Sequence, residues 1–220
     1  MELHVRGVLL PSREPVELWT DHGRISRSPV PGAQTVARDG FVLGEGAGAM
    51  VLERAEFAAA RGATRHARLA GVGTSSDGYH ITAPEPEGIG AGRAISAALR
   101  TAGLAKTDVG HVNAHATATP VGDVAEAAAI RTAIGDHTVV TAPKGALGHL
   151  LGAAGAVEGL ACVLALRDGV VPPTLNLEDA DPGVQLDVVT GSAREVQLTA
   201  AVNDSFGFGG HNVALAFTSA

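Results

Sequence analysis

His115 is the first residue whose surroundings suggest chemistry. It follows an apolar stretch, Val109–Ala114, that we expect to be a strand, and it precedes a helix expected over Val121–Ile134. Sites in α/β proteins are built at the ends of strands. Thr117 and Thr119 alternate after the histidine, so in an extended segment both hydroxyls face the same side. A lone histidine is more often satisfied by backbone groups, but this one belongs to a polar cluster suited to an amide-bearing ligand.

A second histidine, His149, lies in the glycine-rich run Lys144–Gly155, KGALGHLLGAAG. It stands just before a helix expected over Leu150–Leu166. The positive end of a helix dipole disfavours imidazolium, so we expect His149 to be neutral and able to donate a hydrogen bond to a developing oxyanion. Two histidines also suit a metal, but no acidic or cysteine residue lies at ligand spacing from them, and we expect no metal site.

Glu158 lies four residues from both Ala154 and Cys162, so it shares the apolar stripe of the expected helix. We expect this carboxylate to be at least partly buried and paired with Lys144 or a histidine. The alternative is an edge position that faces water, since glutamate resists burial. We expect Cys162 to be a core residue, because a nucleophilic cysteine needs an electropositive and accessible place.

The segment Asn203–Asn212 places Phe206 and Phe208 between glycines and joins two expected strands. A hairpin turn would explain the glycines. It would not explain two aromatic rings in a chain that has five phenylalanines in all. We therefore expect a mobile loop with bulky side chains.

The composition is that of an ordinary globular protein. The chain has 220 residues, 45% of them hydrophobic and 18% charged, which suits one large domain or two small ones. A net charge of −7 without a basic stripe gives little support to nucleic-acid binding. No apolar run is long enough to span a bilayer, and the first ten residues lack a signal-peptide layout. The single cysteine excludes an internal disulfide, so we expect a reducing, cytoplasmic setting.

The elements that must position these residues alternate between strands and helices, which favours a layered α/β fold with a mixed sheet. Residues 1–36 contain four prolines and follow neither hydrophobic period, so we expect irregular structure there. Besides those above, the expected helices are Glu56–Arg61 and Gly88–Ala102, and the expected strands are Ala49–Glu53, Ala67–Ser75, Thr138–Thr141, Gln185–Val189, Ala200–Val202 and Val213–Phe217.

Six stretches together resemble, in order, the β-ketoacyl-acyl-carrier-protein synthases. The spellings APKGALGH and FGFGGHNVALAF are most similar to the type II, elongating branch of actinobacteria. The resemblance runs from Arg38 to the C-terminus. The stretches are Arg38–Glu53, Ser75–Pro84 (SSDGYHITAP), Asn113–Asp123 (NAHATATPVGD), Lys144–Glu158 (KGALGHLLGAAGAVE), Pro172–Leu177 (PPTLNL) and Asn203–Asn212.

The resemblance implies a thiolase-like α/β/α/β/α sandwich with mixed sheets, a homodimer, and condensation of an acyl thioester with malonyl-acyl carrier protein. His115 and His149 match the two histidines that promote decarboxylation and stabilise the enolate. Lys144 matches the lysine of that network, and Glu158 its partner.

The resemblance also assigns substrate contacts. Thr117 and Thr119 match the threonines that hydrogen-bond the phosphopantetheine arm, with Thr82 nearby. Phe208 matches the aromatic gate over the nucleophile. The arm arrives on the acyl carrier protein, so a partner protein is implied and a resident cofactor is not.

One departure bears on activity. The nucleophilic cysteine of the family lies before the stretch that matches Arg38–Glu53, and residues 1–36 do not resemble the family there. We expect residues 37–84 to be a remnant of the N-terminal thiolase-like half and residues 85–220 to be the C-terminal half. The chain would then be the C-terminal part of such an enzyme, without a nucleophile and inactive in acyl transfer by itself.

Three alternatives remain open from the sequence. The first is a non-catalytic subunit similar to chain-length factors, which lack the cysteine but keep their N-terminal half. The second is the class of thiolases and starter-type synthases, although starter-type enzymes use a His and Asn pair. The third is a degenerate product without a stable fold.

Overall fold

The computed structural model describes residues 3–9, 14–21, 24–26, 34–35, 40–177 and 180–220. The chain divides into two compact units. One consists of Met1–Gly40 with Ala118–Pro120, and the other of Phe41–Thr117 with Val121–Ala220.

The first unit contains a small sheet where we expected irregular structure. Its strands are β1 (Leu3–Leu9), β2 (Glu14–Asp21), β3 (Arg24–Ser26) and β4 (Gln34–Thr35), in the order β3-β2-β1-β4. Pro15 is tolerated because it pairs with Val8 of β1 at a point that β3 does not reach, and an edge position does not need the missing N–H. Pro11, Pro29 and Pro31 lie outside the described residues.

The second unit is built on a mixed sheet, as predicted. As far as the chain is described, it has six strands in the order β5-β12-β11-β6-β7-β9. The pairs β11–β12 and β12–β5 are antiparallel, and the other neighbours are parallel. The strands are β5 (Arg68–Ser76), β6 (Val109–Asn113), β7 (Val139–Thr141), β9 (Asp187–Val188), β11 (Ala200–Gly207) and β12 (His211–Thr218), with β8 (Val170–Val171) and β10 (Arg194–Glu195) paired separately.

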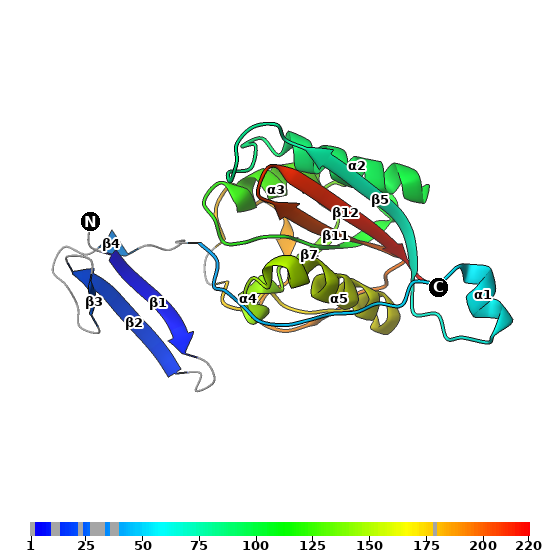
Figure 1. The fold of residues 1–220 in the computed structure, drawn as a ribbon, viewed down its shortest axis with the longest axis horizontal. Helices are drawn as coiled ribbons and strands as arrows, with labels where there is room; N and C mark the ends of the chain where they lie inside the picture. Colours follow the sequence, from blue (N-terminus) through cyan, green and yellow to red (C-terminus); the bar gives the residue numbers. More distant parts are fainter. Residues whose placement is uncertain (1–2, 10–13, 22–23, 27–33, 36–39, 178–179) are drawn as a thin grey trace. The chain divides into compact units, whose positions relative to one another are not determined.

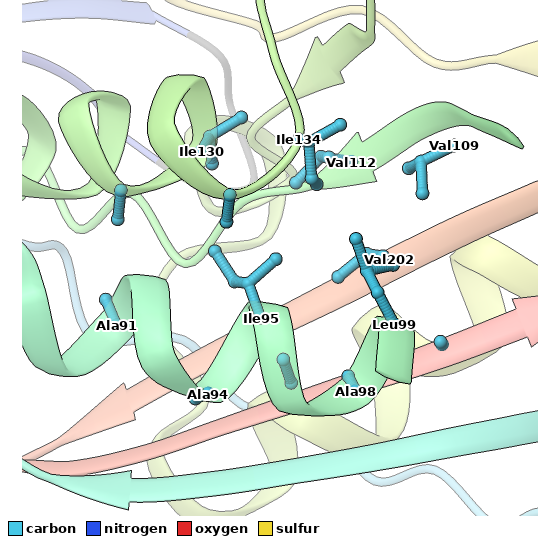
Figure 2. Packing of buried hydrophobic residues seen from close by; sticks show 14 of the residues in the cluster. Ala91, Ala94, Ile95, Ala98, Leu99, Val109, Val112, Ile130, Ile134 and Val202 are labelled. Carbon is cyan, nitrogen blue, oxygen red and sulfur yellow. The ribbon is translucent and has the colours of Figure 1, made fainter. Parts of the chain in front are cut away.

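Two helices cover one face of this sheet. They are α2 (Ile89–Ala102) and α3 (Gly122–Ala133) (Figure 1). Figure 2 shows Ile95 of α2 and Ile130 of α3 in one buried hydrophobic cluster with Val112 and Val202 of the sheet. Each such fully buried side chain contributes about 1.5–3 kcal/mol through the apolar surface it removes from water. This cluster therefore fixes the strand β6 that leads to His115.

The opposite face of the sheet is covered by α5 (Ala154–Asp168), with the short helix α4 (Lys144–Leu147) close by (Figure 1). Cys162 and Leu166 of α5 pack against Ala201 and Phe217 of the sheet. A single turn of 3₁₀ helix, Leu151–Ala153, separates His149 from α5. Among the described residues, no helix is both long and apolar enough to cross a membrane.

The predicted strand over Ala49–Glu53 is wrong. No strand is assigned there, and Val51 is 91% exposed. A strand needs a neighbour to satisfy its backbone, and among the described residues none pairs with this segment. The helix expected next is confirmed as α1 (Ala55–Ala60).

Candidate active site

The structure brings His115 and His149 together. Their ring centroids are 5.4 Å apart and their planes are nearly perpendicular. Phe206 lies 5.8 Å from the His115 ring, and Phe41 lies 4.7 Å from the His149 ring, so two aromatic rings flank the pair. This confirms the prediction that the two histidines share one face, at a separation that a single small carbonyl can bridge.

A buried carboxylate positions His115 through the backbone. The N–H groups of His115 and Ala116 each donate to one oxygen of Glu126, at 2.7 Å and 2.7 Å. Ala116 has a φ of +28°, which an L-residue adopts only when its surroundings hold it there. Glu126 lies on α3, which follows the histidine loop directly.

Glu126 was not predicted as a site residue from the sequence. The only available signal was its place on the helix that follows the His115 loop. Burial raises the pKa of Glu126 to about 7, while its hydrogen bonds from Ala116 and His115 act in the other direction.

A backbone bridge positions His149. Its N–H donates to the carbonyl oxygen of Val42 at 2.7 Å, and its own carbonyl oxygen accepts from the N–H of Gly44 at 3.0 Å. A side-chain Cβ on Gly44 would lie 2.2 Å from the carbonyl oxygen of Leu147, so only glycine fits. This bridge constrains His149 more directly than the helix dipole we invoked, because α5 begins five residues further on.

One hydrogen bond identifies which nitrogen of the His149 ring carries the proton. Its Nδ1 accepts a hydrogen bond from the N–H of Leu151 at 3.2 Å. In the neutral ring, Nε2 therefore carries the proton and is the donor.

Both histidines are held in the neutral form. The pKa of His115 is lowered to about 3, mainly by burial and to a smaller extent by the nearby Lys144 and His149. The pKa of His149 is also lowered, by burial and then by Lys144. Two neutral imidazoles beside a cation can stabilise an oxyanion by hydrogen bonding without supplying a strong acid.

Lys144 and Glu158 form a buried ion pair at 2.5 Å, with side chains 4% and 2% exposed. This confirms that Glu158 is buried and that Lys144 is its partner. Burial raises the pKa of the Glu158 carboxyl even though the ammonium beside it acts in the opposite direction. The pair places a positive charge near both histidines.

The predicted substrate contacts lie on connecting segments. Thr117 and Thr119 lie between β6 and α3. Thr82 is exposed between β5 and α2, where its N–H donates to Nδ1 of His80 at 3.1 Å.

The loop expected over Asn203–Asn212 is shorter than predicted. β11 runs to Gly207 and β12 starts at His211, leaving a turn in which Phe208 is 65% exposed. The aromatic ring in contact with His115 is that of Phe206, on β11.

Two further groups are fully buried. Cys162 is fully buried, as predicted, and burial raises the pKa of its thiol. Asp204, which we did not predict, is also fully buried, and burial raises the pKa of its carboxyl well above the ordinary value. Within the described ranges, no three His, Cys, Asp or Glu side chains gather so as to hold a metal ion.

Comparison with known proteins gives a consistent result. Residues 66–178 match the model of the β-ketoacyl synthase C-terminal domain. The chain is 56% identical over 181 residues to 3-oxoacyl-[acyl-carrier-protein] synthase 2 of Mycobacterium tuberculosis, covering 82% of this chain and 43% of that protein. It is 50% identical to the synthase of the same name from Vibrio harveyi, covering 82% of this chain and 44% of the relative.

Solved structures agree on the fold. A chain of the ishigamide ketosynthase/chain length factor matches with a TM-score of 0.80 and 41% identity, over 84% of this chain and 45% of that one. A β-ketoacyl synthase from Burkholderia phymatum matches with a TM-score of 0.73 and 38% identity, over 76% of this chain and 41% of that one.

The architecture is thus the mixed α/β fold of thiolase-like ketosynthases. The chain spans less than half the length of the relatives it matches. Since the C-terminal domain model covers about half of the chain, this protein belongs to the β-ketoacyl synthase family.

Proposed function

We propose that this chain supplies the decarboxylating part of a 3-oxoacyl-[acyl-carrier-protein] synthase, which condenses an acyl thioester with malonyl-acyl carrier protein in fatty acid or polyketide synthesis. The observation that carries the proposal is the pair of neutral histidines, His115 and His149, 5.4 Å apart between two aromatic rings.

The chemistry follows from where charge develops. The bond between the malonyl carboxylate and the α-carbon breaks, carbon dioxide leaves, and the electron pair becomes an enolate with negative charge on the thioester oxygen. Ring N–H groups of His115 and His149 donate to that oxygen. In condensation, the enolate carbon then attacks an acyl thioester carbonyl and expels a thiolate. Without an acyl partner, the enolate takes a proton and leaves as an acetyl thioester.

The substrate arm and its carrier are part of the same proposal. Thr117, Thr119 and Thr82 would hydrogen-bond the neutral, amide-rich phosphopantetheine, and Phe208 would gate the nucleophile's pocket. The partner is an acyl carrier protein, and the arm it carries takes the place of a resident cofactor. A type II polyketide ketosynthase solved in complex with its acyl carrier protein is 30% identical to this chain, with a TM-score of 0.74, which supports this partner.

On the same basis, we propose that the intact enzyme is a homodimer and that it works in the cytoplasm. A chain-length-factor-like subunit is the alternative, since one solved relative is a ketosynthase in complex with its chain length factor. The retained histidine pair favours the decarboxylating role.

The test is the conversion of malonyl-acyl carrier protein to its acetyl form, followed by mass spectrometry. We expect slow decarboxylation by the purified chain and at least a tenfold loss in His115→Ala and His149→Ala. His66→Ala, at an exposed histidine, is the matched control and should keep the full rate. A rate for the unaltered chain no higher than that of the double histidine variant would refute the proposal.

A further inference from the structure

Helix α2 has two chemically different sides. Ile95 and Ala98 are fully buried and belong to the hydrophobic cluster that holds the helix against the sheet (Figure 2). Arg93, Ser96 and Arg100 are all exposed. Residues three and four positions apart are neighbours on a helix surface, so Ser96 lies between the two arginines on one stripe of α2.

This stripe borders a hollow of about 750 Å³ between α2 and α3, which we call the α2 hollow. It is lined by the three residues of the stripe, by Ile89 and Gly92 of α2, and by Thr132 of α3. Pockets that bind small molecules have volumes of about 300–1,000 Å³. The α2 hollow therefore has room for a small molecule, and the residues that line it are separate from the histidine pair.

The charge in and around the α2 hollow is mainly positive. Among the described residues, Arg93 and Arg100 have no acidic partner, whereas five other arginines hydrogen-bond a side chain: Arg54, Arg61, Arg131, Arg167 and Arg194. Lys106 adds a third cation at the edge, where its ammonium donates to the carbonyl oxygen of Thr132 at 2.6 Å. The single acid that lines the hollow is Glu87, just before α2.

The arrangement of donors suits a phosphate group. Guanidinium groups bind phosphate through pairs of charge-assisted hydrogen bonds. An anion placed over Ser96 can accept from the hydroxyl and from the guanidinium groups on both sides of it. Hydroxyl and guanidinium donors together satisfy more phosphate oxygens than either kind alone.

The rest of the hollow favours a small molecule over a protein segment. Protein interfaces depend on several large side chains that become buried at their centre. Ile89, which is 46% exposed, is the one large apolar side chain that lines the α2 hollow, and it lies next to Gly92 on the helix surface. One such contact suits the organic part of a phosphate ester.

We propose that the α2 hollow binds a phosphorylated small molecule. Its phosphate lies over Ser96 and is held by Arg93 and Arg100, and its organic part contacts Ile89. This binding site is additional to the decarboxylation that we propose for the histidine pair.

The experiment is a titration of the ¹⁵N-labelled chain, followed by NMR, with phenyl phosphate and separately with inorganic phosphate. We expect saturable shifts of the backbone amides of Gly92, Ser96 and Thr132, and tighter binding of phenyl phosphate because its ring contacts Ile89. Ile89→Ser should remove the difference between the two probes.

The arginine variants test the phosphate contacts. Arg93→Gln and Arg100→Gln should each weaken the binding of phenyl phosphate at least fivefold, since each removes a charged donor. Arg65→Gln is the matched control, because Arg65 is also exposed and without a partner among the described residues but lies outside the α2 hollow. It should bind as the unaltered chain does.

Three results would overturn the proposal. The first is binding that Arg93→Gln and Arg100→Gln leave unchanged while circular dichroism shows both variants folded. The second is equal affinity for the two probes. The third is a glutamate-rich peptide that shifts the same amides when phenyl phosphate shifts none, which would make an acidic protein segment the occupant. The titration measures binding alone, so its outcome does not depend on whether decarboxylation is observed.

Discussion

Backbone hydrogen bonds hold both histidines of the candidate site. Glu126 accepts the amides of His115 and Ala116, and the Val42–Gly44 bridge holds the amide and carbonyl of His149. This arrangement fixes the positions of the rings, and it leaves Nε2 of His149 to donate to a ligand while Nδ1 accepts from the N–H of Leu151. Pre-organised donors of this kind stabilise charge without reorganising when it forms.

Stability should fall in mild acid because of His115. Burial lowers its pKa from 6.5 to about 3, so as pH falls below 6.5 the unfolded chain takes up a proton that the folded chain refuses. His111, with a pKa of about 4 through burial, acts in the same direction. Between pH 7.5 and 5, we expect the free energy of unfolding of His115→Gln to fall by about 2 kcal/mol less than that of the unaltered chain.

Urea unfolding at the two pH values measures this difference. Glu126 contributes to the pH dependence of stability with the opposite sign, since its raised pKa of about 7 favours the folded state as pH falls. This contribution is the same in the unaltered chain and in His115→Gln. The exposed His66→Gln serves as control. Equal losses in the unaltered chain and in His115→Gln would show that His115 is not buried as a neutral ring.

Removing one partner of the buried pair Lys144–Glu158 should destabilise the protein strongly, whereas replacing both with apolar residues should change its stability little. Removing one partner leaves an uncompensated buried charge, so we expect Lys144→Met to lower the free energy of unfolding by about 3 kcal/mol. The double variant Lys144→Met with Glu158→Leu should recover most of that loss. Arg167→Met, which breaks a half-exposed pair with Asp168, should cost less than about 1 kcal/mol in the same urea titration. A double variant no more stable than the single one would contradict this account.

At the scale of elements, the bridge between the segment after Gly40 and His149 depends on one close approach. Gly44→Ala would force a Cβ to 2.2 Å from the Leu147 carbonyl oxygen, so the segment must move. We expect the melting temperature to fall by about 3 °C or more and decarboxylation to fall with it. Gly152→Ala has open space around the new methyl and should change neither. Unchanged melting in Gly44→Ala would mean that the bridge does not hold His149.

Helices and strands whose residues follow a local pattern could be predicted from the sequence. Features that depend on residues elsewhere in the chain could not. Helices α2, α3 and α5 and strands β5, β6, β11 and β12 follow from apolar periodicity, glycine stops and short connections. The segment Ala49–Glu53 has the apolar residues of a strand but no neighbour among the described residues. Glu126 was missed because its role is to accept two amides eleven and ten residues away, which no sequence period reveals.

At the scale of the whole molecule, the proposed function assigns the donors that would stabilise an enolate to a chain whose single cysteine, Cys162, is fully buried. The decarboxylation that we propose needs only the neutral histidine pair, His115 and His149. Condensation also needs a nucleophile that holds the acyl group as a thioester. The purified protein should therefore decarboxylate malonyl-acyl carrier protein but should not carry out condensation.

The last prediction tests that separation at Cys162. The thiol is fully buried, its Sγ donates to the Val202 carbonyl oxygen at 3.7 Å, and burial raises its pKa, so it is neither accessible nor ionised. Incubation with acyl-acyl carrier protein should leave the mass of the native chain unchanged, and a maleimide should label Cys162 only after denaturation in guanidinium. Cys162→Ala should decarboxylate malonyl-acyl carrier protein as the unaltered chain does. An acyl adduct on Cys162 that turns over to a 3-oxoacyl product would show that this helix opens and that the chain carries its own nucleophile.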